Sequence, residues 1–588
     1  MCSIIGYSGK EKAAPALVEG LRKMEYRGYD SVGVATVDDG KILLRKGVGK
    51  VEDVDRALSL HALPGSLGIG HTRWATHGAV ISSNAHPHIA CNSNIAVVHN
   101  GIIENYNELK EELMKLGHVF RSETDSEVIS HLLEHFYKIE ESVKGAMLRT
   151  CRKLKGSFAF VAMFDNSCLA GARYDEPLII GLSHDGYFIA SDVLGFLKHT
   201  DRATFLDNRD IVLIMGKDVS LFNFDGEKVF RPITQVAWEL GSSEKGKYVH
   251  YTLKEIYEQS STILKTMEQK KEKLQIFCNI LKNAKDVYIT GSGTSYHSAL
   301  VAKNVFSKYA RIRPETIMSS EFEYSSDLLD SNSVLLAISQ SGETADVLQS
   351  VKLAKEKGAK ILSIVNIPSS SLARISDSFL EVKCGPEIGV AATKSFTGQL
   401  ALIYYVADLV GDNQVGISTD KLLVSKIIEE TLGMEEKIAE ITAQVRDARD
   451  IYILGRSIHF PICLEGALKI KELAYIHAEG MAAGELKHGP LALIDKNSLV
   501  IVLNPSDSTY SDTLSNSHVI KSRGAKLIGI TNQNNPIYDH NIIIPKLRDP
   551  LMPLIEVIPL QIIAYHLALF NNANPDYPRN LAKSVTVR

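Results

Sequence analysis

The sequence lacks several features that mark secreted, metal-binding and membrane proteins. Its seven cysteines are scattered and form no Cys-x-x-Cys pair, which excludes a disulfide framework and argues against a zinc site. His86 and His88 form a possible ligand pair, but no third ligand is evident nearby, so we expect hydrogen-bonded histidines and no metal. No apolar run approaches the roughly 18 residues of a membrane span, and no secretory signal pattern opens the chain.

The charge is also low. The formal net charge is −4 at pH 7, and no polybasic arm or basic stripe argues for nucleic acid. A hydrophobic share of 45% and a charged share of 23% are typical of a globular protein. We therefore expect a cytoplasmic protein whose partners are small molecules, with no nucleic acid and no membrane among them.

The length of 588 residues exceeds a single hydrophobic core and predicts about three or four domains. Residues 2–238 are rich in short β-type runs such as "SIIGYSG" and "IAVVHNG", with helical stretches between them, which predicts an α+β sheet domain. Residues 240–251 are small, polar and glycine-containing before a long charged helix pattern begins. We place the main domain boundary there.

The second half contains an internal repeat. "DVYITGSGTSYHSAL" from Asp286 matches "DIYILGRSIHFPICLEGAL" from Asp450, and "GAKILSIVN" from Gly358 matches "GAKLIGITN" from Gly524. Each copy places β-branched apolar runs before turns and helical stretches, which is typical of a parallel sheet covered by helices on both faces. We predict two doubly wound domains, with ligands beyond the carboxyl ends of their strands.

Two hydroxyl-rich turns in the first copy precede helices: "GSGTS" at residues 291–295 and "SQSGET" at residues 339–344. Such turns offer backbone N–H groups, side-chain donors and a positive helix end to one anion, and a sugar phosphate fits. For a single turn, helix capping by serine or threonine explains the pattern equally well. A dinucleotide is a weaker candidate, because "GSGTSY" lacks the third glycine of that motif.

The second copy offers acid–base groups instead. Glu465, Lys469 and Glu472 fall on one helix face, a pattern that by itself is typical of a solvated face with an i,i+4 ion pair. Because this helix is equivalent to the anion-binding helix of the first copy, it can supply proton-transfer groups. His488 lies in a glycine-flanked turn, and Lys583, in the terminal tail, could form an imine if it were buried.

The amino end combines a thiol with a base. If the initiator methionine is removed, Cys2 carries both the thiol and the free α-amino group. Elsewhere in this half, Arg73 could pair with a carboxylate and Asp125 with an ammonium, while Asn100 and Gly101 could donate to an oxyanion. These features suit an amino acid with an acyl side chain.

Together these motifs resemble one family over essentially the whole length. "MCSIIGY", "HTRWATHG", "VVHNGIIEN", "SQSGETADVL", "EGALKIKE", "GELKHGPLALI" and "PRNLAKSVTV" occur in the order of the glucosamine-6-phosphate synthases, the isomerising glutamine:fructose-6-phosphate aminotransferases. The resemblance implies an α+β Ntn-hydrolase glutaminase domain of αββα layers, followed by two α/β doubly wound sugar isomerase (SIS) domains. It also implies L-glutamine and D-fructose 6-phosphate as substrates, a homodimer, and neither cofactor nor metal.

The domain boundaries follow from the same resemblance. We expect a glutamine amidotransferase type 2 domain at residues 2–240, a linker at 241–250 and SIS domains at 251–430 and 431–575. The tail at residues 576–588 is expected to contribute to the sugar site.

In the glutaminase domain, the resemblance makes Cys2 the nucleophile with its own α-amine as base, and Asn100 and Gly101 the oxyanion hole. Trp74 matches the gate of an ammonia channel. The positions that match glutamine-binding residues are Arg73, Thr76, His77 and Asp125.

In the sugar site, the resemblance implies that His488, contributed by the neighbouring subunit, opens the ring, that Lys583 forms an imine and that Glu472 moves a proton between C1 and C2. The positions expected to bind the sugar phosphate are Ser292, Thr294, Ser295, Ser339, Gln340, Ser341, Thr344, Val390, Lys469 and Ala582.

Two other functions fit parts of the sequence. A sugar-phosphate sensor would use the SIS domains but would leave Cys2 and Lys583 without a role. An amidophosphoribosyltransferase would share the first half, but it would need an acidic pair for pyrophosphate where this repeat has serine-rich turns.

Overall fold

The computed structural model describes residues 2–165, 168–236, 245–411 and 413–586. The chain divides into unit 1, which comprises Met1–Ser242 and Ala582–Arg588, and unit 2, Ser243–Leu581. Part of the expected linker, residues 241–244, lies outside the described residues, so the linker and the finer domain boundaries stay predictions.

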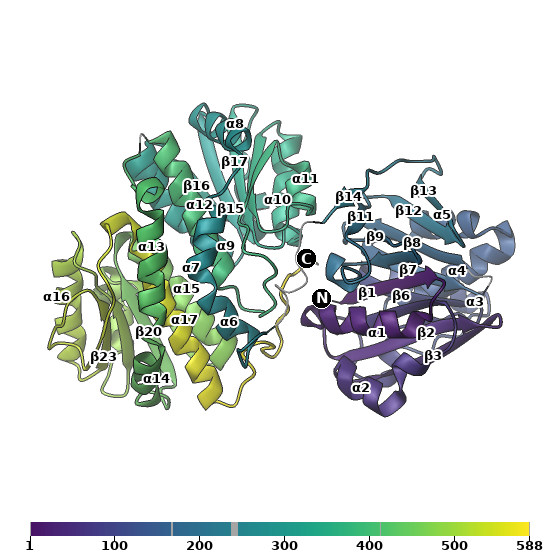
Figure 1. The fold of residues 1–588 in the computed structure, drawn as a ribbon, viewed down its shortest axis with the longest axis horizontal. Helices are drawn as coiled ribbons and strands as arrows, with labels where there is room; N and C mark the ends of the chain where they lie inside the picture. The colour runs from purple at the N-terminus through teal and green to yellow at the C-terminus, as the bar shows by residue number, and fades with distance from the viewer. Residues whose placement is uncertain (1, 166–167, 237–244, 412, 587–588) are drawn as a thin grey trace. The chain divides into compact units, whose positions relative to one another are not determined.

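Unit 1 contains two antiparallel sheets (Figure 1). The strands of the eight-stranded sheet are, in spatial order, β14 (Thr234–Gln235), β11 (Arg202–Phe205), β9 (Ile179–Leu182), β10 (Gly186–Ala190), β1 (Ser3–Gly9), β4 (Leu67–Arg73), β2 (Ser31–Asp38) and β3 (Lys41–Val48). Those of the six-stranded sheet are β13 (Asp218–Asn223), β12 (Asp210–Met215), β8 (Cys168–Tyr174), β7 (Gly156–Phe164), β6 (Ile95–Ile103) and β5 (His88–Ile89).

The two sheets face each other across a core that includes Ile4, Ile69, Val98 and Val161. Helices α1 (Ala13–Met24) and α2 (Val51–Leu58) pack on the first sheet, whereas α4 (Glu127–Glu140) and α5 (Val143–Lys153) pack on the second, with α3 (Tyr106–Lys115) beside α4. Because β1 is covered by α1 on one side and by the second sheet on the other, its run "SIIGYSG" is buried almost throughout, Ser3 and Ser8 included. The predicted αββα layers are confirmed.

Unit 2 contains two parallel five-stranded sheets. The first is ordered β16 (Pro314–Met318), β15 (Asp286–Gly291), β17 (Ser333–Ser339), β18 (Lys360–Val365) and β19 (Ser378–Glu381). The second is ordered β21 (His477–Ala482), β20 (Asp450–Gly455), β22 (Leu499–Leu503), β23 (Lys526–Thr531) and β24 (His540–Ile543). Both follow the doubly wound order 2-1-3-4-5, so the repeat found in the sequence is a repeat of one fold.

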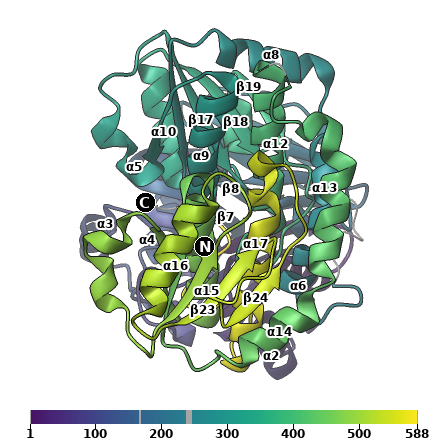
Figure 2. The ribbon, with the colours of Figure 1, turned by 90° about the vertical axis from the view of Figure 1, so that its left-hand side faces the viewer.

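Helices cover both sheets of unit 2, and α15 lies beside α17 at its centre (Figure 2). The helices are α6 (Tyr251–Tyr257), α7 (Gln259–Thr266), α8 (Lys271–Lys282), α9 (Thr294–Val305), α10 (Ala345–Glu356), α11 (Ser371–Ile375), α12 (Lys394–Val410), α13 (Ile417–Leu432), α14 (Glu435–Ala443), α15 (Phe460–Ala474), α16 (Tyr510–Lys521) and α17 (Pro553–Phe570).

The expectation that no apolar run approaches the length of a membrane span was wrong, because one segment of the described chain, which includes helix α17, is long and apolar enough to cross a membrane. That segment, Asp549–Phe570, has a mean hydropathy of 1.6, but 83% of its apolar window is buried inside the structure. Such burial is that of a core helix.

Candidate functional site

The thiol of Cys2 lies beside the end of β4. Its Sγ accepts a hydrogen bond from the backbone N–H of Trp74 at 3.1 Å, and it lies 3.4 Å from the Trp74 carbonyl. The pairing of β1 with β4 sets this contact, because Ser3 is in register with Thr72. Burial raises the pKa of the Cys2 thiol, so a nearby base is needed to form the thiolate at neutral pH.

Asn100 and Gly101 lie next to Cys2 on β6. Asn100 Nδ2 donates to the Cys2 carbonyl at 3.0 Å, and its Oδ1 lies 3.1 Å from Nε2 of His71. Burial lowers the pKa of His71 to about 3, so this histidine is neutral and orients the Asn100 amide. Gly101 has φ +111°, and a Cβ there would lie 2.1 Å from the Ser157 carbonyl oxygen, so only glycine fits.

Arg73 and Asp125 are both buried, and Arg73 lies close to the Cys2 thiol. Arg73, the last residue of β4, donates to the carbonyls of His77, Gly78 and Ala79 and so closes the turn that follows Trp74. Burial lowers the pKa of Arg73, while Cys2 and Asp125 are near enough to oppose that shift electrostatically. Arg73 thus has Cys2 and Asp125 among its neighbours, while the roles of Arg73 and Asp125 in glutamine binding stay predictions.

The remaining expected glutaminase residues lie on the same turn. Thr76 is exposed and His77 is half-buried. The Trp74 ring meets that of Tyr29 edge to face, with centroids 5.7 Å apart.

Sequence reasoning missed three neighbouring groups. Arg27 Nε donates to the Cys2 carbonyl at 3.4 Å, and Asp30 Oδ2 accepts from the Ala75 N–H at 2.9 Å. Both occur in "EYRGYDS", whose polar character was the available signal. Burial raises the pKa of Glu176 to about 7, and its Oε2 accepts a hydrogen bond from Thr586 in the terminal segment.

In unit 2, both hydroxyl-rich turns lie at the carboxyl ends of the adjacent strands β15 and β17. This is the point where the strand order reverses, which is where ligands bind in doubly wound sheets. Ser292 Oγ lies 2.6 Å from Ser319 Oγ, while Ser339 Oγ accepts from the Gly342 N–H and lies 3.2 Å from Thr344 Oγ1.

Helices α9 and α10 begin directly after the two hydroxyl-rich turns. The residue before α9 is Gly293, which has no side chain, and the side chain of Thr344, before α10, makes no capping hydrogen bond. Thr294 and Ser295 form the first turn of α9, and Ser341 Oγ accepts from the Glu343 N–H at 3.2 Å. Gln340 lies between Ser339 and Ser341, with its carbonyl accepting from the Asn366 N–H. Because the serine hydroxyls accept hydrogen bonds within the turn, binding of a sugar phosphate by these residues stays a prediction.

The sequence pattern of Glu465, Lys469 and Glu472 is typical of a solvated helix face, but in the structure this face of α15 is largely buried. The Lys469 side chain is 1% exposed, with Nζ 3.4 Å from Glu465 Oε1 and 2.6 Å from Glu472 Oε2. Although burial opposes the charge, the two carboxylates raise the pKa of Lys469. Nζ also donates to Thr294 Oγ1 at 3.1 Å, which joins the two copies of the repeat. A lysine held protonated in this way is a poor imine former.

The other expected sugar-site residues are more dispersed. His488 is exposed at the end of a short 3-10 helix, Glu485–His488. Val390 is buried, and its N–H donates to the Asp576 carbonyl. Ala582 and Lys583 belong to the terminal segment that groups with unit 1. Their approach to the sugar stays a prediction.

The histidines of the "HPH" segment are hydrogen-bonded, as expected. His86 Nδ1 accepts from the His99 N–H at 3.2 Å, and His88 Nε2 lies 3.1 Å from Thr124 Oγ1. Burial lowers the pKa of both imidazoles well below the ordinary value. A different cluster, around Cys91, has the donor atoms of a metal site.

Comparisons with known proteins match both units. The glutamine amidotransferase domain model matches residues 71–198, and the SIS domain model matches residues 280–408 and 444–570. The glutamine–fructose-6-phosphate aminotransferase (isomerizing) of Pyrococcus horikoshii is 44% identical over 598 residues, and that of Thermococcus kodakarensis is 42% identical over 601 residues; both comparisons cover 100% of each chain. The C-terminal domain of the glucosamine-fructose-6-phosphate aminotransferase from Francisella tularensis, a solved structure, is 34% identical with a TM-score of 0.54, covering 57% of this chain and 99% of that one.

Proposed function

The chain belongs to the glutamine–fructose-6-phosphate aminotransferase family, and we propose that it converts glutamine and D-fructose 6-phosphate into glutamate and D-glucosamine 6-phosphate. The geometry that supports this best is the position of Cys2. Cys2 directly precedes β1, and its Sγ lies 3.1 Å from the backbone nitrogen of Trp74. The side-chain amide of Asn100 donates to the Cys2 carbonyl.

In the glutaminase reaction, the Cys2 thiolate attacks the side-chain amide carbon of glutamine. The carbon–nitrogen bond then breaks, and the nitrogen leaves as ammonia after taking up a proton. Water hydrolyses the resulting thioester to glutamate and restores the thiol. The α-amine of Cys2 is the base, since a free α-amine has a pKa of about 7.7 to 8.0.

The surrounding residues bind glutamine and stabilise the oxyanion. Asn100 Nδ2 and the Gly101 N–H donate to the developing oxyanion. Arg73 pairs with the α-carboxylate and Asp125 with the α-ammonium, with further contacts from Thr76 and His77 in the turn. Trp74, which follows Arg73 directly, gates the ammonia path.

In the sugar reaction, the two hydroxyl-rich turns bind the phosphate. The other binding positions include Val390, Lys469 and Ala582. His488 of the partner subunit opens the ring, Lys583 forms an imine with C2, and Glu472 moves a proton between C1 and C2. Because Lys469 is held protonated between carboxylates, it orients Glu472 and leaves the imine to Lys583.

This arrangement requires a homodimer, and we propose that the enzyme acts as one in the cytoplasm. His488 is exposed, so it is accessible to the sugar site of a second subunit. Mixing His488→Ala chains with Lys583→Arg chains should restore one complete sugar site per mixed dimer. No recovery of activity in the mixture would contradict the shared site.

The overall reaction is tested by product identification. Purified protein with glutamine and fructose 6-phosphate should release glucosamine 6-phosphate and glutamate in equal amounts. Cys2→Ala should abolish glutamine hydrolysis but leave sugar-phosphate binding intact, while Cys278→Ser, a thiol of unit 2, should change neither. Glutamate without amino sugar would mean a different acceptor, and full hydrolysis by Cys2→Ala would remove the nucleophile assignment.

The imine is tested by hydride trapping. Reduction in the presence of fructose 6-phosphate should attach the sugar covalently to Lys583, as shown by peptide mass spectrometry. Label at Lys469, or label that persists in Lys583→Arg, would overturn the assignment.

A further inference from the structure

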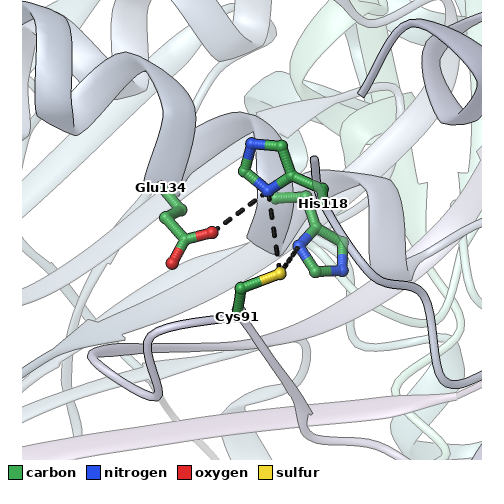
Figure 3. A group of neighbouring side chains, drawn as sticks. Cys91, His118 and Glu134 are labelled. Atoms are coloured by element: carbon green, nitrogen blue, oxygen red, sulfur yellow. Dashed lines mark hydrogen bonds and ion pairs between the residues drawn. The ribbon is translucent and has the colours of Figure 1, made fainter. Parts of the chain in front are cut away.

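Four metal-ligand side chains from three separate segments meet in unit 1 (Figure 3). Cys91 follows β5, and His118 lies in the segment that joins α3 to α4. His131 and Glu134 are one turn apart on α4, so both project from the same helix face. One donor atom from each of the four lies within 4.8 Å of all the others.

The separations between donor atoms fit a tetrahedral ion. Cys91 Sγ lies 3.6 Å from His131 Nδ1 and 3.9 Å from His118 Nδ1, and His118 Nδ1 lies 3.1 Å from Glu134 Oε2. With zinc–sulfur bonds of about 2.3 Å and zinc–nitrogen or zinc–oxygen bonds of about 2.1 Å, tetrahedral angles separate the ligand atoms by about 3.4 to 3.6 Å. The three separations given above differ from these values by no more than about 0.3 Å, and the remaining pairs of donor atoms lie within 4.8 Å of one another.

The buried carboxylate of this cluster also favours binding of a cation. His131 and Glu134 are each 1% exposed. Glu134 Oε1 accepts from the Asn92 N–H at 2.7 Å, but among the described residues Oε2 has no hydrogen-bond partner, although His118 Nδ1 is close. A buried carboxylate oxygen in this position needs a positive partner. One thiolate and one carboxylate would neutralise a divalent ion while the two imidazoles remain neutral.

An outer carboxylate lies beside one of the ligands. His131 Nε2, the nitrogen that points away from the cluster, lies 3.5 Å from Glu127 Oε1. Histidines that bind metals usually present their second nitrogen to a carboxylate, which fixes the ring and its tautomer.

We propose that Cys91, His118, His131 and Glu134 bind one zinc ion, with release of the Cys91 thiol proton. Because all four ligands come from the protein, the site is structural and leaves no open position for substrate. This assignment does not depend on the proposed reaction. It revises the expectation that the scattered cysteines hold no metal.

The site would stabilise the segment that carries Asp125. Besides facing His131, the Glu127 carboxylate accepts hydrogen bonds from the Arg121 N–H, the Ser122 N–H and the Ser122 hydroxyl. The same segment continues to Asp125, whose Oδ2 accepts from the Ile103 N–H at 2.8 Å. Zinc would therefore tie α4, the α3–α4 segment and the β5–β6 turn together at the edge of the glutaminase site.

Metal content tests the proposal first. The full chain, purified without chelator and supplied with zinc, should contain one zinc per chain by elemental mass spectrometry. After removal of zinc and addition of Co²⁺, it should show a thiolate-to-cobalt charge-transfer band and the intense visible bands of a tetrahedral site. Absence of stoichiometric zinc together with a six-coordinate cobalt spectrum would overturn the proposal.

Substitutions test the ligand set. Cys91→Ser should abolish the charge-transfer band, and Glu134→Gln should lower zinc affinity while keeping that band. Glu127→Gln should weaken zinc binding by about 10- to 100-fold without altering the cobalt geometry. His135→Gln on the same helix and Cys278→Ser in unit 2 are matched controls that should leave zinc content at one per chain. Full zinc content and an unchanged cobalt spectrum in Cys91→Ser would refute the site.

Discussion

Nζ of Lys469 lies 2.6 Å from Oε2 of Glu472, and the same ammonium group donates to the Thr294 hydroxyl of the other repeat copy. The Lys469 side chain is almost fully buried. Its ammonium group, which would normally be solvated, instead links the two repeat copies through the hydrogen bond to Thr294. The acid–base group proposed for the sugar reaction is thereby held by an internal ion pair.

Lys469→Met should destabilise unit 2, because Glu465, which is 0% exposed, would lose the lysine ammonium and keep only its contacts with Thr294 and the His297 ring. Breaking a buried ion pair costs about 3 to 5 kcal/mol, and replacing both partners by apolar residues usually recovers much of it. Hydrogen exchange of α15 amides should show the loss in Lys469→Met and its partial recovery in Lys469→Met/Glu465→Met. Lys426→Met, which breaks an exposed pair with Glu430, should cost less than about 1 kcal/mol. Equal protection of α15 in the wild type and Lys469→Met would show that the ion pair contributes nothing.

Gly101→Ala should impair glutamine hydrolysis selectively. The added Cβ would meet the Ser157 carbonyl at 2.1 Å and force β6 away from β7 beside the proposed oxyanion hole. We expect a fall in glutaminase kcat of at least about 100-fold, comparable with loss of one oxyanion donor, while hydride trapping of sugar is unchanged. Gly40 also has a positive φ, but an added Cβ there meets no atom within 4 Å. Gly40→Ala therefore measures the effect of the strained backbone conformation without a steric clash. A wild-type glutaminase rate in Gly101→Ala would contradict the predicted clash.

Unit 2 should lose stability as the pH rises, because of a buried histidine. His459 Nδ1 lies 2.8 Å from Glu556 Oε2, and Nε2 lies 2.9 Å from Asp507 Oδ2. Although burial opposes its charge, the carboxylates raise the pKa of His459 from 6.5 to about 10. The stabilisation is therefore fully present below pH 6.5 and is lost as the pH rises through about 10, with an upper bound on the order of 5 kcal/mol.

Hydrogen exchange of α17 amides across this pH range, corrected for the intrinsic exchange rate, measures the effect. His459→Gln should be less stable near pH 6 and should show a flatter pH dependence. A wild-type profile that is flat between pH 6.5 and 10 would exclude the charged histidine.

Thr344→Val should weaken binding of fructose 6-phosphate. The substitution keeps the shape of the turn but removes the hydroxyl that lies 3.2 Å from Ser339 Oγ. A hydrogen bond to a charged phosphate contributes about 1.5 to 3 kcal/mol, so KM for the sugar should rise at least about tenfold. Ser376→Ala removes a hydroxyl pair with Ser363 elsewhere in the same domain and serves as the control. An unchanged KM would place the phosphate elsewhere.

Local sequence patterns determined the architecture because they reflect short-range periodicity. The matched runs from Asp286 and Asp450 predicted two equivalent parallel sheets, and both sheets have the same strand order. Polar turns directly after apolar runs must lie at the carboxyl ends of strands, so the positions of Ser292 and Ser339 at one sheet edge followed from the sequence. The family motifs assigned Cys2 and Asn100 to one catalytic site, and the Asn100 amide does donate to the Cys2 carbonyl.

Only the tertiary structure decided which charged groups are buried and which distant groups meet. The face of α15 is typical of a solvated ion pair, yet α9 covers it and turns Lys469 inward. Cys91, His118 and the pair on α4 share no continuous motif, and the His131-x-x-Glu134 spacing was the available signal. Such contacts depend on sheet register and on the packing of whole helices, which join residues far apart in the chain, whereas a local pattern specifies only the neighbours within one element.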